Sequence, residues 1–157
     1  MAFLLTLKLI NLKMKSSTNP RTINYIVVHC TAGRTTQTLA DLRREFRQKG
    51  WQAPGYHYVV TRDGHVEKLL GEDKVANGVK GHNHDSIHIA YIGGINDRTL
   101  QPEDNRTPQQ KRALEDQLRL LHLIYPKAVI QGHRDFAGVK KACPCFDAKR
   151  EYSYLNR

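Results

Sequence analysis

The feature that most constrains the fold is the alternation of short apolar runs with amphipathic, helix-like segments. The runs are rich in β-branched and aromatic residues and are bounded by turn formers; they span residues 23–30, 56–61, 65–69, 87–92 and 128–131. Asp63-Gly64, between the second and third runs, is typical of an antiparallel hairpin. Strands interleaved with helices indicate a single α/β domain in which a mixed central β-sheet is flanked by helices.

Two helices are predicted from apolar spacing and from their capping residues. In residues 37–49 the apolar side chains recur at helical spacing, and Thr38 and Asp41 can form a capping box. The second helix begins after Thr107, which precedes a proline and has a glutamine three positions later, and it ends before Pro126. Each helix has one apolar stripe, so each is expected to pack on the sheet.

The longest segment without apolar periodicity is residues 71–85, called the long loop below. It contains five charged residues, three glycines and two histidines, so we expect it to lie on the surface. Loops of this length in compact domains are usually functional or disordered. His82 and His84 are therefore candidates for substrate contact, with plain solvent exposure as the alternative.

Residues 1–22 are expected to form a tail outside a domain of residues 23–157. The apolar stretch within residues 1–14 is too short to span a bilayer, and it lacks the leading positive charge and the cleavage site of a secretory signal. No transmembrane segment is expected. We favour a true start at Met14, over a weak signal-like leader or an added strand or helix, because an ordinary polar stretch follows it.

Charge and cysteine content narrow the class of protein. The chain of 157 residues has a formal net charge of +10, which predicts attraction to an anionic partner such as nucleic acid, a phosphate-bearing polymer or an acidic membrane surface. Its three cysteines are an odd number, and two of them flank one proline, so a disulfide framework is not expected. The thiols are better explained as metal ligands or core residues.

The segment of residues 132–147 concentrates reactive side chains directly after an apolar run. It contains His133, Lys141, Cys143 and Cys145 among turn-forming residues. Loops held by a rigid scaffold often contain catalytic or metal-binding groups, and imidazole and thiolate are the ligands that zinc prefers. The segment therefore predicts a zinc site, with either cysteine as the thiolate, but a protein zinc site needs at least three ligands.

The third ligand must come from elsewhere, and six histidines are candidates: His29, His57, His65, His82, His84 and His88. We favour His29, because it lies at the carboxyl end of the first strand just before a glycine-containing loop. Strand ends are where sites assemble in α/β sheets. Alternation directs Cys30 to the opposite face, so Cys30 is expected to be a buried core residue. Spacing alone leaves the choice of ligand open.

Four motifs, in order from about residue 23 to the end, resemble one known family. They are residues 27–33 (VVHCTAG), 55–58 (GYHY) followed by 62–64 (RDG), 86–87 (SI) with 93–94 (GG), and 132–133 (GH) followed by 141–144 (KACP). This arrangement is similar to the type 2 N-acetylmuramoyl-L-alanine amidases, most closely to their phage lysozyme or endolysin branch. Peptidoglycan recognition proteins are more distant relatives.

The resemblance implies a zinc amidase fold and assigns roles to individual residues. The enzyme would hydrolyse the amide between the lactyl group of N-acetylmuramic acid and L-alanine in peptidoglycan. Carried over by position, His29, His133 and Cys143 match the ligands of one zinc ion, and Tyr56 and Lys141 match two residues that assist catalysis. The cell-wall-recycling branch has Asp and Glu where this chain has Cys143 and Tyr56, and many peptidoglycan recognition proteins have Thr at the position of Lys141.

The resemblance also implies partners and a place of action. An endolysin of a phage or prophage is made in the bacterial cytoplasm and lyses the cell wall, and its basic surface would adhere to anionic cell-wall or outer-membrane polymers. Two alternatives stay open. One is a module that binds peptidoglycan without cutting it. The other is a regulator, because phage lysozymes of this type can also inhibit a phage RNA polymerase.

Overall fold

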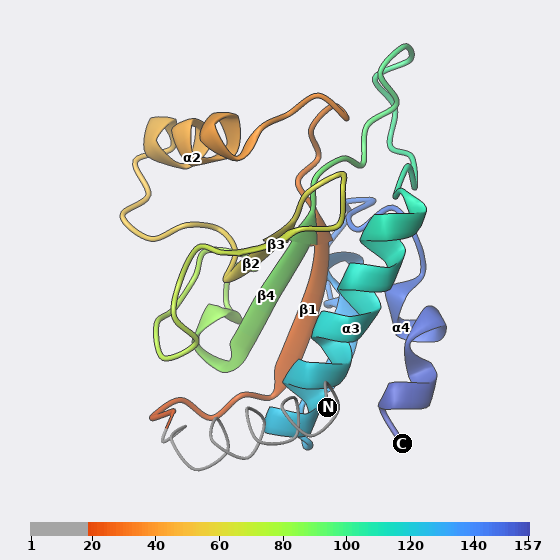
Figure 1. Cartoon of the computed structure of the whole chain (residues 1–157). Helices are drawn as coiled ribbons and strands as arrows, with labels where there is room; N and C mark the ends of the chain where they lie inside the picture. The colour runs from red at the N-terminus through yellow and green to blue at the C-terminus, as the bar shows by residue number, and fades with distance from the viewer. Residues whose placement is uncertain (1–18) are drawn as a thin grey trace, which may run out of the picture.

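Five strands form one mixed sheet in the order β3-β2-β4-β1-β5 (Figure 1). This computed structural model describes residues 19–157, and the expectations for residues 1–18 lie outside that range. The strands are β1 (Tyr25–Cys30), β2 (Tyr58–Val60), β3 (Val66–Lys68), β4 (Ser86–Tyr91) and β5 (Val129–Gly132). β1 pairs in parallel with β4 and β5, β2 pairs in parallel with β4, and β3 pairs antiparallel to β2. The predicted α/β domain with a mixed sheet is confirmed.

The two long helices begin directly after the capping residues identified in the sequence, Thr38 and Thr107. They are α2 (Leu39–Gln48), α3 (Pro108–Ile124) and α4 (Ala148–Glu151), with single 3-10 turns η1 (Asn83–Asp85), η2 (His133–Asp135) and η3 (Ser153–Leu155). The Thr38 side chain accepts a hydrogen bond from the backbone of Asp41, and Thr107 accepts one from Gln110. In the part of the chain that the structure describes, no helix has both the length and the apolar character needed to cross a bilayer.

The two faces of the sheet have different roles. Alternation along β1 directs Ile26 and Val28 into the main core, which also contains the apolar stripe of α3. Figure 1 shows α3 lying along the sheet. On the opposite face, α2 packs on Val59 of β2, while Val27 is covered by residues of the long loop and of the segment after η2. His29 belongs to this second face. The fold thus buries one face under α3, while α2 and loops together cover the other face.

Every strand differs from its predicted range by one or two residues at an end, and the differences in β2, β3 and β5 are the most informative. β2 begins at Tyr58, so Tyr56 lies before the strand and not within it. β3 is confined to Val66–Lys68, because it is an edge strand whose length is set by its pairing with the three residues of β2. β5 extends to Gly132, which pairs with Val28, so His133 comes directly after the strand.

The long loop lies on the surface, as predicted, and Arg21 holds it at both ends. The guanidinium donates through Nη1 to the carbonyls of Glu72 (2.7 Å) and Lys74 (2.6 Å), and through Nη2 to those of Asn83 (2.8 Å) and Ser86 (2.8 Å). Three of these carbonyl groups lie within the loop, near its two ends, and that of Ser86 directly follows it. Residues 19–22 of the expected tail are therefore bonded to the domain.

Candidate functional site

The candidate site lies where two neighbouring parallel strands end. His29 is the next-to-last residue of β1, and His133 follows the last residue of β5. Because the strands are parallel, both histidines reach the same edge of the sheet, and their ring centroids are 4.9 Å apart. The loop after η2 then brings Cys143 to within 3.7 Å of His29, measured from Sγ to Nδ1. Tertiary structure thus brings together residues from the first and the last of the four motifs.

The geometry of His29, His133 and Cys143 fits a zinc ion. Each offers one ligand atom, and these atoms all lie within 4.8 Å of one another. A tetrahedral zinc ion with its usual Zn–N and Zn–S bond lengths separates its ligand atoms by roughly 3.3–3.7 Å, so little movement is needed to close the group around it. Two imidazoles and one thiol are also a preferred donor set for zinc, and three protein ligands leave one position open.

Burial keeps both imidazoles in the neutral form that a metal requires. Burial, together with the nearby His88, His133 and Lys141, holds the pKa of His29 well below its usual range. Burial and the charge of Lys141 lower the pKa of His133 to about 4. Neutral imidazole is the form that binds metal, so at neutral pH neither ring has to lose a proton.

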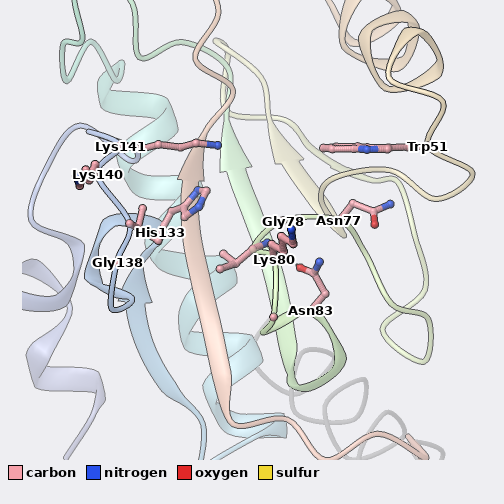
Figure 2. Close-up of a pocket in the computed structure, with 12 residues that line it drawn as sticks. Trp51, Asn77, Gly78, Lys80, Asn83, His133, Gly138, Lys140 and Lys141 are labelled. Carbon is pink, nitrogen blue, oxygen red and sulfur yellow. Dashed lines mark hydrogen bonds between the residues drawn. The ribbon is translucent and has the colours of Figure 1, made fainter.

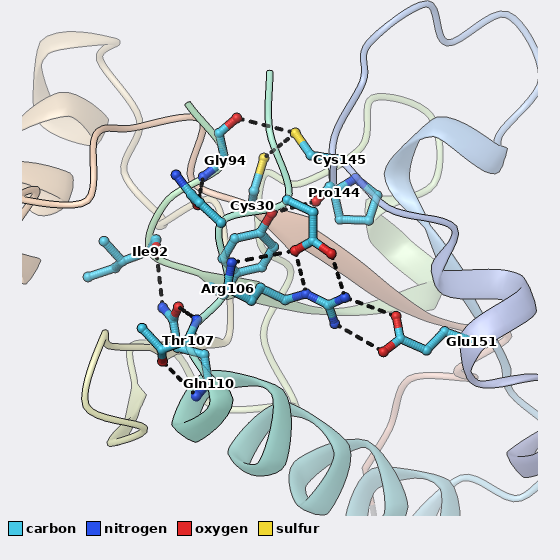
Figure 3. Close-up of polar contacts among 12 residues, drawn as sticks. Cys30, Ile92, Gly94, Arg106, Thr107, Gln110, Pro144, Cys145 and Glu151 are labelled. Atoms are coloured by element: carbon cyan, nitrogen blue, oxygen red, sulfur yellow. Dashed lines mark hydrogen bonds and ion pairs between the residues drawn. The ribbon is translucent and has the colours of Figure 1, made fainter. Parts of the chain in front are cut away.

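The structure also separates the two thiols that the sequence left as alternatives. Cys143 faces His29, and its Sγ accepts a hydrogen bond from the backbone N–H of Cys30 at 3.3 Å. Cys145 points away from the histidines, with its Sγ 3.7 Å from that of Cys30 and 3.4 Å from the carbonyl oxygen of Gly94 (Figure 3). The contact with Cys30 and burial both raise the pKa of Cys145. As predicted, Cys30 is a buried core residue.

The loop that contains both thiols is anchored by Arg106. The guanidinium lies 3.3 Å from the ring centroid of Phe146, next in the chain after Cys145. It forms ion pairs with Asp104 at 2.8 Å and Glu151 at 3.0 Å, so it ties the loop to α4 (Figure 3). A buried guanidinium that bonds a carboxylate along each of two edges and lies over an aromatic ring restricts the loop, and that restriction positions the thiols.

Tyr56 and Lys141 line the same small cavity as the three potential ligands. The Tyr56 hydroxyl donates to the carbonyl of Cys30 at 3.3 Å, and its ring lies 5.1 Å from that of His29. Burial, reinforced by the nearby Cys143 and Cys30 thiols, raises the pKa of Tyr56 well above its usual range, so the hydroxyl stays a hydrogen-bond donor. Lys141 extends over the strand ends near His133 (Figure 2).

A larger pocket of about 740 Å³ continues from this cavity and contains residues that the sequence motifs did not indicate. Trp51 forms one wall, the long loop contributes a second wall, and the loop before Cys143 contributes two lysines (Figure 2). The side chains that give the pocket its polar and basic character are Asn77, Lys80, Asn83, Lys140 and Lys141. For the wall formed by the long loop, the only indication in the sequence was the length of that loop.

The remaining candidate histidines lie outside this group. His82 packs its ring against Phe136 at 4.5 Å, and His84 is exposed beside Asp85, because the η1 turn directs both away from the strand ends. Neither lines the cavity or the larger pocket. Of the other candidate ligands, His65 is paired with Glu67 on the surface and His57 is buried. His88 contacts the Nε2 atom of His29.

Comparisons with known proteins agree with this geometry. The sequence profile described as N-acetylmuramoyl-L-alanine amidase matches residues 19–146. An endolysin of Enterobacteria phage K11 is 42% identical over 125 residues, covering 78% of this chain and 81% of that protein. The solved endolysin amidase LysCS of Clostridium intestinale is 26% identical, with a TM-score of 0.70 over 88% of this chain and 86% of that one. Drosophila PGRP-LB, at 22% identity and a TM-score of 0.64 over 85% and 81% of the two chains, shares the fold.

Proposed function

This chain belongs to the N-acetylmuramoyl-L-alanine amidase family, and from that premise we propose that it is a zinc-dependent endolysin. The bond it cleaves is the amide between the lactyl group of N-acetylmuramic acid and L-alanine in bacterial peptidoglycan. The observation that carries the zinc proposal is the grouping of His29, His133 and Cys143 in a cavity that Tyr56 and Lys141 also line.

The proposed roles follow from the chemistry of each side chain. A zinc ion held by these residues would supply Lewis-acid polarisation of the amide carbonyl and would activate water as a nucleophile near neutral pH. His29 and His133 bind as neutral imidazoles, and Cys143 binds as a thiolate. The Lys141 ammonium stabilises the negative charge that develops on the amide oxygen. The Tyr56 hydroxyl donates a hydrogen bond to the reacting groups and helps transfer a proton to the leaving amine.

The larger pocket is the proposed binding site for the stem peptide. Its lysine and asparagine side chains match the carboxylates and amides of a peptide that has acidic residues, and the Trp51 ring offers an apolar wall. The net charge of +10 favours adhesion to anionic cell-wall or outer-membrane polymers. We propose that the protein is made in the bacterial cytoplasm and acts on the cell wall, in keeping with its similarity to phage endolysins.

Two cysteine variants and a zinc titration test this proposal. Protein stripped of metal should release no stem peptide from purified peptidoglycan, and added zinc should restore release. Cys143→Ser should abolish this zinc-restored activity, whereas Cys145→Ser, the matched control two residues away, should retain it. Zinc content and thermal unfolding of each variant show whether a loss comes from the metal site or from misfolding.

The same experiment separates catalysis from binding alone. A folded, zinc-loaded protein that binds peptidoglycan and releases no peptide would overturn the proposal in favour of a non-catalytic binding module. Equal loss of activity in both cysteine variants, with both still folded, would contradict the assignment of Cys143 as the thiolate ligand.

A further inference from the structure

We propose that His88 is a positioning residue that holds the His29 imidazole in the orientation and tautomer needed to bind zinc through Nδ1. This inference rests on the proposed zinc site and assigns a function to a side chain outside the ligand group. His88 belongs to β4, the strand beside β1, and it lies on the same face of the sheet as His29.

The two nitrogens of the His29 ring have different neighbours. Nδ1 faces the Cys143 Sγ at 3.7 Å, whereas Nε2 lies 3.0 Å from Nδ1 of His88. A histidine that binds a metal through Nδ1 keeps its proton on Nε2, and that N–H needs an acceptor. His88 Nδ1 is the atom in position to accept it. The contact therefore sets both the plane of the His29 ring and the nitrogen that remains free for the metal.

The surroundings of His88 keep its ring in this place. The ring is fully buried and lies nearly parallel to that of His57, with centroids 5.9 Å apart and an angle of 13° between the planes. The main chain of His88 is held by His57 as well, through a bond from the His88 N–H to the His57 Nδ1 at 3.0 Å. On the loop side, Gly78 approaches so closely that a Cβ there would lie 2.4 Å from His88 Nδ1. Glycine at residue 78 leaves the space that the imidazole occupies.

Core packing alone does not account for an imidazole in this position. Among the described residues, His88 Nε2 is buried and has no hydrogen-bond partner. A buried polar atom without a partner opposes folding, and an apolar side chain of similar size would fill the space without that cost. The retained polar ring is explained by its other nitrogen, which is aimed at a proposed metal ligand.

Zinc affinity, measured by competition with a chromophoric chelator, tests the inference without relying on activity. His88→Leu removes the acceptor and should weaken zinc binding about 10- to 100-fold. His88→Asn should recover part of the loss, because its Oδ1 takes the place of the imidazole Nδ1 beside the side-chain Cγ. Thermal unfolding of the metal-free proteins should show little net change in His88→Leu, because the substitution removes the buried unpaired Nε2 of His88 but leaves the His29 Nε2 without its acceptor.

Gly78→Ala provides a second route to the same answer. Its methyl group should displace the His88 ring and weaken zinc binding while leaving every ligand and His88 itself chemically intact. In the His88→Leu background the same change should add little, because the two substitutions disturb one contact. Equal zinc affinity in the parent and in folded His88→Leu protein would overturn the inference. A parent protein that binds no zinc would instead overturn the proposed function on which the inference rests.

Discussion

At the scale of single residues, the site separates groups that we propose to bind a metal from groups that we propose to act on the substrate. His29, His133 and Cys143 have their ligand atoms directed at one another. Lys141 is exposed and lies at the junction of the small cavity and the larger pocket. Its charge lowers the pKa of both histidines, so it opposes a second positive charge in the cavity. A lysine in this place is better explained by a transient negative charge on a substrate than by metal binding.

Lys141→Gln should therefore lower kcat without weakening zinc binding. Removing one group that stabilises a developing oxyanion typically costs about 10²- to 10³-fold in kcat. Zinc affinity should stay the same or rise, because a positive charge near the ion is lost. Lys140→Gln is the matched control: the neighbouring lysine also lines the larger pocket, so its loss should raise KM and leave kcat nearly unchanged. A parallel drop in zinc affinity and kcat for Lys141→Gln would contradict this role.

At the scale of elements, the wall of the larger pocket depends on a residue outside it. The long loop contributes Asn77, Lys80 and Asn83 to the pocket but has little regular structure of its own. Arg21 bonds to backbone carbonyls at both ends of this loop. Because a guanidinium presents several donors in a fixed fork, it can hold two chain segments at once, which the ammonium of lysine does less well.

Arg21→Ala should loosen the long loop while leaving the zinc site formed. One hydrogen bond to a charged group is worth about 1.5–3 kcal/mol. Because Arg21 is partly exposed, the free energy lost by the loop should lie at the lower end of that range. We expect tryptic cleavage after Lys74 or Lys80 to become about tenfold faster, which corresponds to about 1.4 kcal/mol. KM for peptidoglycan should rise, zinc affinity should persist, and Arg21→Lys should be intermediate. Unchanged cleavage in Arg21→Ala would show that other contacts hold the loop.

At the scale of the whole molecule, several buried histidines make folding depend on pH. Burial is the first cause of a lowered pKa in each of His29, His57, His88 and His133, and the pKa of His57 falls to about 4. A group whose pKa is depressed by folding binds its proton more readily in the unfolded chain. Its contribution to stability is present above the unfolded value near 6.5 and is lost as the pH falls toward the folded value.

The free energy of unfolding of the metal-free protein should therefore fall steeply between pH 6.5 and pH 4. Each extra proton bound by the unfolded chain contributes a slope of about 1.4 kcal/mol per pH unit, and more than one histidine should contribute. Urea unfolding at a series of pH values measures this slope. His65→Gln, a change at a surface histidine, should leave the slope as it is. A flat profile across this range would mean that the buried histidines are not held neutral by the fold.

The sequence by itself determined the elements and the chemical types of the site. Strand patterns, capping boxes and the Asp63-Gly64 turn depend on neighbours in the chain, so the α/β class and both long helices follow from local preferences. The motif resemblance indicated His29, Tyr56, His133, Lys141 and Cys143, and the structure places all five around one cavity. Their catalytic and metal-binding roles, like a possible polymerase partner, stay predictions.

Only the tertiary structure decided which side chains meet across the fold. In the structure, Cys143 and not Cys145 lies beside His29. His82 and His84 lie outside the pocket, and His88 contacts the Nε2 atom of His29. These outcomes depend on the register between parallel strands and on the path of loops between them. Both are set by contacts between residues far apart in the chain, and no local pattern specifies them.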